Sequence, residues 1–232
     1  MTGLVFEARD FRTGWGAGAP PVATGLGEAA RLAAATLVDD GARALVSFGL
    51  AGGLARGLAP GTVIVADRVV AADAGWRLEA APAAEHLGAC TGTLWAATTP
   101  LLALAEKEAA AAHSGAIAVD MESAPVLATA RRHGLPALVV RVVADPAERP
   151  LPRLAARAAR PDGTLDFRTT TATLLRYPTD WPLLAASARD TARARARLRD
   201  AAAGLARLAR QGLLERFLDV PVEDVGRGPL VR

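Results

Sequence analysis

Apolar segments of strand length alternate with helical segments along most of this chain. The most apolar segment is Ala137–Val143, and similar segments occupy Ala42–Phe48 and Thr62–Ala71. Segments with helical character at Glu28–Val38 and Glu122–His133 lie between them. Nearly continuous apolar strands are typical of sheets that helices cover on both faces. The pattern therefore predicts an α/β fold, a three-layer α/β/α domain with a central mixed, mostly parallel sheet.

Shorter segments complete this pattern. Further strands are expected at Thr2–Phe6, Val22–Thr24, Trp76–Glu79, Thr91–Ala97 and Ala116–Val119, and a further helix from about Pro100 to Ala112. The segment from about Trp181 to Phe217 predicts one long helix, or two helices that are separated near Gly204. We expect one domain over residues 1–232, with a C-terminal helical extension at about 181–217.

Composition excludes several classes of protein. No segment approaches the roughly 18 uncharged apolar residues that a membrane span requires, and Met1–Glu7 lacks the basic start of a signal peptide. The single cysteine, Cys90, suits a reducing compartment, so we expect a cytoplasmic protein. The net charge is only +3, and all basic residues but Lys107 are arginine. This composition indicates a GC-rich genome rather than a nucleic-acid-binding surface.

Two acids, Asp120 and Glu122, stand where an expected strand gives way to a helix. Open α/β sheets bind their ligands at the carboxyl ends of strands. A carboxylate at that position can accept hydrogen bonds from the two neighbouring hydroxyls of a ribose. Acids in a first helical turn also cap helices, so spacing alone leaves both interpretations open.

Asp145 ends the most apolar strand, where partial burial would raise its pKa. A carboxyl that stays protonated near neutral pH can act as a general acid. The alternatives are an ion pair with Arg141 or a turn at Asp145-Pro146. Glu7 also follows an expected strand and could activate water, or it could be a surface acid beside Arg9.

A glycine-rich segment follows the Ala42–Phe48 strand. We interpret Gly49, Leu50, Ala51 and Gly52 as a turn whose backbone approaches a ligand closely. The segment lacks the spacing of a dinucleotide-binding fingerprint.

The histidines are scattered, and neither they nor Cys90 have metal-ligand spacing. We therefore expect no cofactor; inorganic phosphate stays open as a co-substrate.

The order of four motifs resembles a known family. Ser47–Gly53, Pro60–Asp67, Ala116–Ser123 and Val140–Asp145 follow one another as in the purine nucleoside phosphorylase and methylthioadenosine nucleosidase superfamily. The resemblance covers about residues 2–200. Its most specific part is the pairing of Val-Asp-Met-Glu-Ser with the later Val-Arg-x-x-x-Asp.

The resemblance implies a role for five residues. Glu122 matches the glutamate that binds the ribose hydroxyls, and Met121 matches the methionine that packs on the sugar. Asp145 matches the aspartate that protonates or hydrogen-bonds the purine N7. Glu7 matches the glutamate that activates water in the nucleosidases, and Asp120 matches an acid of their motif.

Three positions depart from the family pattern. Leu50 replaces a common Ser or Thr that contacts phosphate or water, and Ser47 replaces a phosphate-binding arginine of some phosphorylases. The base-stacking aromatic residue expected near 97–100 is missing. These departures favour water as the nucleophile.

The run Asp145–Pro152 resembles the hopanoid-associated branch of the superfamily, which is linked to the removal of adenine from adenosylhopane. We therefore predict an enzyme of hopanoid biosynthesis that cleaves the N-glycosidic bond of a 5′-substituted adenosine. The alternatives are a general purine nucleoside phosphorylase or methylthioadenosine nucleosidase, and a nucleoside-binding protein without activity.

Two expectations concern partners. The helix expected at 181–217 carries eight arginines between Arg189 and Arg216 together with an apolar stripe. Such a helix can lie on an anionic membrane, which would make the protein membrane-peripheral; packing against the sheet is the favoured alternative. The resemblance also implies a homo-oligomer.

Overall fold

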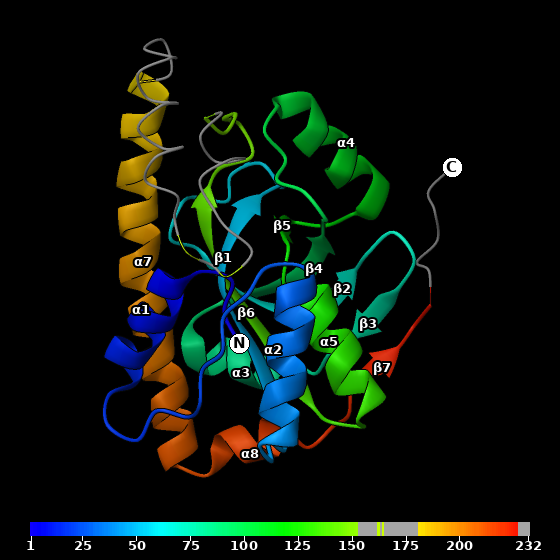
Figure 1. Cartoon of the computed structure of the whole chain (residues 1–232). Coiled ribbons are helices and arrows are strands. Elements are labelled where there is room, and N and C mark those ends of the chain that lie inside the picture. The colour runs from blue at the N-terminus through cyan, green and yellow to red at the C-terminus, as the bar shows by residue number, and fades with distance from the viewer. Residues whose placement is uncertain (153–161, 163, 165–180, 227–232) are drawn as a thin grey trace.

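A computed structural model describes residues 1–152, 162, 164 and 181–226 of the chain (Figure 1). One sheet contains β1 (Leu45–Gly53), β2 (Val63–Val70), β3 (Gly75–Arg77), β4 (Cys90–Ala96), β5 (Ala118–Asp120), β6 (Ala137–Asp145) and β7 (Glu223–Asp224). Their order is β4-β5-β1-β6-β2-β3-β7. Because β2 also pairs with β4, the first five strands of this order form a closed ring.

The sheet is mixed, as predicted. Its two longest pairings, β1 with β6 and β2 with β4, are parallel, and so is the pairing of β4 with β5. The pairings β1–β5, β2–β6, β2–β3 and β3–β7 are antiparallel. Parallel register between β1 and β6 places the carboxyl ends of both strands at the same edge of the sheet.

Helices cover both faces of this sheet. They are α1 (Val5–Trp15), α2 (Glu28–Asp39), α3 (Ala81–Leu87), α4 (Leu104–Ser114), α5 (Ser123–Arg132), α7 (Trp181–Arg210) and α8 (Leu213–Phe217). Leu138, Val140 and Val142 of β6 pack in one core with α1, α3 and α7. Val139 and Val143 pack in another core with α2 and α5. Since successive strand residues face opposite sides, the two cores confirm the three-layer arrangement (Figure 1).

The strand predicted at Thr2–Phe6 is wrong. Thr2 forms only an isolated bridge with Thr24, and α1 begins at Val5. The Glu7 carboxylate accepts the backbone N–H groups of Gly3 and Leu4, which lie at the start of the helix. A glutamate at the third helical position stabilises a helix start in this way. The apolar residues before Glu7 were not sufficient to make a strand.

The turn predicted at the glycine-rich segment is also wrong. Strand β1 continues through this segment, because its residues pair with β6 as far as Gly52 and with β5 at Gly52 and Gly53. The ladder between β1 and β6 shifts by one residue after Ala51, and the shift pairs Gly52 with Asp145.

The C-terminal part of the described chain has two helices, but the break is not at Gly204. Helix α7 continues through Gly204, which packs against Leu87, and ends before Gly212, whose φ is +66°. The structure also contains α3, a helix that was not predicted from the sequence.

The apolar stripe of α7 faces the protein interior. Its buried residues include Leu198, Leu205 and Leu208, which pack against the sheet. Arg195 and Arg199 form ion pairs with the buried Asp10 of α1, which lies alongside α7 (Figure 1). Packing, the favoured alternative for this helix, is therefore what the structure shows. None of the helices in the described ranges is long and apolar enough to cross a membrane.

Candidate active site

Glu7 lies against the carboxyl-terminal half of β1. Its Oε1 accepts the N–H of Leu50 at 2.8 Å, and its Oε2 accepts the N–H groups of Gly3 at 2.9 Å and Leu4 at 2.8 Å. The residue is only 3% exposed, so the alternative of a surface acid is wrong. Burial raises the pKa of Glu7, although the three N–H donors oppose this shift.

The glycines of β1 leave room for acids rather than forming an open turn. A Cβ atom at Gly49 would lie 2.9 Å from Oε1 of Glu7, which is closer than real Cβ contacts allow. A Cβ at Gly52 would lie 3.3 Å from both carboxylate oxygens of Asp145. Leu50 and Ala51 were also predicted to approach a ligand. In the structure, Leu50 donates its N–H to Glu7, and Ala51 is buried in the core.

Arg141 of β6 organises the centre of the site. Its Nε donates to Oδ2 of Asp120 at 2.7 Å, and its Nη2 donates to Ser47 Oγ at 2.8 Å and to Ser123 Oγ at 3.2 Å. The Asp120 side chain is 0% exposed and also accepts the Ser123 N–H at 3.1 Å, at the start of α5. Asp120 therefore anchors Arg141 and α5, and its carboxylate faces these partners.

Arg141→Met is expected to destabilise the protein by about 3–5 kcal/mol, because it leaves the buried Asp120 carboxylate without its counter-charge. Urea-induced unfolding of the purified variant measures this loss. Arg31→Met is the matched control: Arg31 pairs with Glu28 on the surface of α2, where water screens the two charges, so its loss should change the stability far less. Equal stability of the two variants would contradict this assignment.

Glu122 lies between Arg141 and Gly3. Its Oε2 is 3.8 Å from Nη2 of Arg141, and a Cβ at Gly3 would lie 2.7 Å from its Cδ. The side chain forms no capping bond with α5, so the capping alternative applies to Asp120 and not to Glu122. Burial, followed by the negative charge of Asp120, raises the pKa of Glu122 to about 8.

Because the pKa of Glu122 is raised, the folded protein should lose stability as the pH rises from about 4.5 to about 8. Between the ordinary value of 4.5 and about 8, the folded protein retains a proton that the unfolded chain releases. Stability therefore falls as the pH rises through this range, by up to about 1.4 kcal/mol per pH unit. Glu122→Gln should lack this component. Thermal unfolding of wild type and Glu122→Gln at pH 5, 6.5 and 8 tests this prediction. A difference in stability between the two proteins that does not change with pH would exclude the raised pKa of Glu122.

Asp145 ends β6 and is bound by a residue that the sequence analysis did not assign to the site. Its Oδ2 accepts a hydrogen bond of 2.5 Å from Nζ of Lys107, which α4 contributes. The ion pair expected with Arg141 is therefore wrong. Burial raises the pKa of Asp145, and the Lys107 ammonium and the Arg149 guanidinium oppose that rise. The one signal for Lys107 was its position as the single lysine of the chain, within an alanine-rich helix.

The three principal acids are close together along β1. Glu7 lies over Gly49 and Asp145 over Gly52, and three residues of a strand span about 10 Å. Glu122 lies beside Gly3, whose N–H binds Glu7. The structure thus brings Glu7 and Glu122 together and places Asp145 farther along the same strand, toward its carboxyl end.

Two cavities lie in this part of the fold, and neither is lined by the three acids. A cavity of about 470 Å³ is lined by Met121, Trp95, Ala97, Leu101 and their neighbours. None of the three acids lines it, but Met121, the residue before Glu122 in the chain, forms part of its wall.

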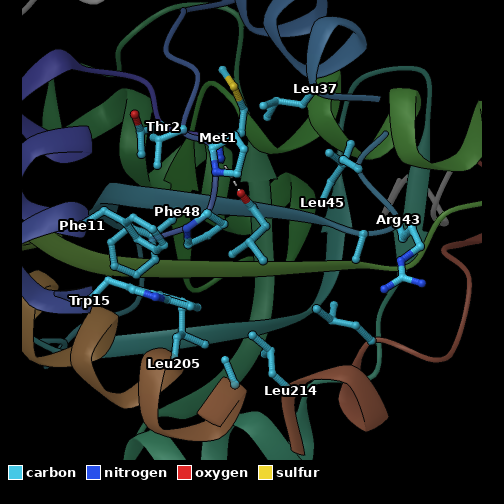
Figure 2. Close-up of a pocket in the computed structure, with 18 of the residues that line it drawn as sticks. Met1, Thr2, Phe11, Trp15, Leu37, Arg43, Leu45, Phe48, Leu205 and Leu214 are labelled. Atoms are coloured by element: carbon cyan, nitrogen blue, oxygen red, sulfur yellow. Dashed lines mark hydrogen bonds between the residues drawn. The ribbon is translucent and has the colours of Figure 1, made fainter. Parts of the chain in front are cut away.

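A second cavity, of about 420 Å³, opens around the start of β1 (Figure 2). Its walls are mostly apolar and include Phe11, Trp15, Phe48, Leu205 and Leu214, and they contain none of the three acids. In the described ranges, no group of three or more His, Cys, Asp or Glu side chains could hold a metal ion.

Comparisons with known proteins identify the family. The model of the phosphorylase superfamily matches residues 8–76 and 70–175. No curated protein sequence matches the chain.

Solved structures share the fold at low sequence identity. The 5′-methylthioadenosine/S-adenosylhomocysteine nucleosidase of Helicobacter pylori, solved with butyl-thio-DADMe-Immucillin-A, has a TM-score of 0.60 and 14% identity, over 92% of this chain and 96% of that chain. A futalosine hydrolase mutant of Helicobacter pylori gives the same four values. The Streptococcus pneumoniae nucleosidase with the inhibitor MT-ImmA has a TM-score of 0.52 and 17% identity, over 79% of each chain.

The fold and the buried acids place the protein among α/β proteins with a site at the carboxyl edge of a mixed sheet. Because the family model covers most of the chain, the protein belongs to the phosphorylase superfamily.

Proposed function

We propose that this protein cleaves the N-glycosidic bond of a purine nucleoside. The observation that carries the proposal is the position of three acids along β1: the buried Glu7 and Asp145, and Glu122, whose side chain is 12% exposed. Family membership supports it, as do structural neighbours that are named as a nucleosidase and a futalosine hydrolase.

In the proposed mechanism, the bond from C1′ of the ribose to N9 of the purine lengthens before the nucleophile bonds. Positive charge then gathers on the sugar, and negative charge moves into the purine. Asp145 donates a proton to N7 of the departing base, Glu122 accepts hydrogen bonds from the ribose hydroxyls, and Glu7 removes a proton from water. Groups placed where charge develops contribute most of the acceleration in such reactions.

The charges around Glu7 favour water over phosphate as the nucleophile. Glu7, Glu122 and Asp120 are all acidic, whereas Arg141 already bonds Asp120 and two serine hydroxyls. Among the described residues at this position, Arg141 therefore has its charge compensated by Asp120, and a buried phosphate dianion beside it would lack a counter-charge. Ser47, which stands where some phosphorylases have arginine, is fully buried and bonded to Arg141. Catalysis then requires neither a cofactor nor phosphate.

For the substrate we propose an adenosine with a large apolar 5′ substituent, adenosylhopane, and hence a role in hopanoid biosynthesis. The cavity of about 470 Å³ beside Met121 supports this proposal, because it adjoins the expected sugar position and has the apolar walls Trp95, Leu101 and Pro125. A cavity of this size lies within the range for drug-sized ligands. We further propose a cytoplasmic homo-oligomer.

The test is an assay of purified protein with adenosine, 5′-methylthioadenosine and an adenosylhopane analogue, each with and without phosphate. Chromatography should detect free adenine, with the highest kcat/KM for the hopane analogue and no dependence on phosphate. Highest activity on 5′-methylthioadenosine would overturn the substrate proposal alone. Binding of all three nucleosides without release of adenine would indicate a nucleoside-binding protein and overturn the enzymatic proposal.

A further inference from the structure

Lys107 is buried in a site that uses all of its hydrogen-bond donors. Its side chain is 1% exposed, and its Nζ donates to Oδ2 of Asp145 at 2.5 Å, to the Pro146 carbonyl at 2.8 Å and to the Arg149 carbonyl at 2.9 Å. An ammonium group has three N–H donors, so none is left for a substrate. Lys107 can act on a substrate only through Asp145 and the loop that follows it.

The same contacts make the two oxygens of Asp145 unequal. Oδ2 is bonded to Lys107, whereas Oδ1 accepts no hydrogen bond within the described part of the chain. The carboxylate lies over Gly52, where the missing side chain leaves space beside it. Oδ1 is therefore the oxygen that is free to meet a ligand.

We propose that Lys107 is a positioning residue for the general acid, holding Asp145 by Oδ2 so that Oδ1 meets the purine, and neutralising the carboxylate that proton donation leaves behind. This inference rests on the proposed function. In the donation step, the O–H bond at Oδ1 breaks and an N–H bond forms at N7, while the electrons of the C1′–N9 bond move into the purine. The Lys107–Asp145 pair changes from ammonium and carboxylic acid to ammonium and carboxylate, and no other reactant is required.

The charged groups near Asp145 support this role for Lys107. Arg149 also lowers the pKa of Asp145, but its guanidinium forms an ion pair with Asp190 of α7, so much of its charge is compensated. The Glu148 carboxylate accepts the N–H of Gly57, and this bond lowers the pKa of Glu148. Among the described residues, only Lys107 bonds the Asp145 carboxylate directly, and its charge lowers the pKa of Asp145 more than the charge of Arg149 does.

The decisive variant is Lys107→Met, which keeps an unbranched side chain one atom shorter and removes the charge. An opposite charge at this distance lowers the pKa of a carboxyl by about 1–3 units, so its loss should move the alkaline limb of the kcat–pH profile up by about one pH unit or more. We expect kcat on the plateau to fall about tenfold, because the new carboxylate is left unpaired, with KM within about twofold. The control is Glu108→Gln, the next residue of α4, whose side chain is exposed; its profile should match wild type.

An alkaline limb of Lys107→Met at the wild-type pH would overturn the proposal. If Lys107→Met does not fold, the double variant Lys107→Met/Asp145→Asn, in which neither charge is left unpaired, keeps the proposal testable. Its kcat should lie within about threefold of that of Asp145→Asn, since Lys107 acts through Asp145; a much larger loss would overturn it. The proposed function fails separately, if wild type releases no adenine or if Asp145→Asn is fully active.

Discussion

Asp145→Asn is expected to lower kcat for purine release by about 10²–10⁴-fold, the usual contribution of a general acid. Asparagine keeps the shape of the side chain over Gly52 and can still form a hydrogen bond, but it cannot transfer a proton to the departing base. KM should change much less than kcat, because the lost interaction arises in the transition state. Steady-state assays with chromatographic detection of the free base measure both constants.

A matched control for this variant is Asp190→Asn, which changes the same type of residue at the nearby ion pair with Arg149. Its kcat should remain within about threefold of wild type, since Asp190 does not contact Asp145. Asp145→Asn leaves the Lys107 ammonium without its carboxylate, so thermal unfolding must show that the variant is folded at the assay temperature. Near-wild-type purine release by folded Asp145→Asn would refute its assignment as the acid.

Glu7→Gln is expected to reduce kcat by a similar factor, about 10²–10⁴-fold, because an amide cannot remove a proton from water. The carboxylate accepts N–H groups on both of its oxygens. The amide would therefore place an N–H donor opposite a backbone donor and shift the side chain. Initial rates of adenine release give kcat, and thermal unfolding monitors the structural cost.

Arg9→Gln serves as the control for Glu7→Gln, since Arg9 lies on the same helix with an exposed side chain. Its rate should stay within about twofold of wild type. If Glu7→Gln folds and remains as active as Arg9→Gln, Glu7 does not serve as the base and another group must activate the nucleophile.

The sequence predicted strands correctly where a run of apolar residues forms a strand that is buried on both faces. Ala137–Val143 and Thr62–Ala71 correspond to β6 and β2, because aliphatic residues in both match strands buried on two faces. The apolar pattern failed near Glu7 because a local capping interaction outweighs it. The Glu7 side chain binds the backbone at Gly3 and Leu4 and starts a helix, although the preceding residues resemble a strand.

The candidate site was predictable in its acids but not in their partners. Strand ends and motif order indicated Glu7, Glu122 and Asp145, and the structure places all three acids along β1. The pairings of Asp120 with Arg141 and of Asp145 with Lys107 join residues 21 and 38 positions apart. Side chains so far apart in sequence meet only through the packing of β5, β6 and α4, which no local pattern specifies.

The most direct test of the account is the fate of oxygen during turnover of a 5′-substituted adenosine in H₂¹⁸O. We predict free adenine and a sugar product that carries one ¹⁸O atom at C1, identified by mass spectrometry, without phosphate in the buffer. Folded wild-type protein that leaves every such nucleoside intact would contradict the central claim that the three acids along β1 cleave the glycosidic bond.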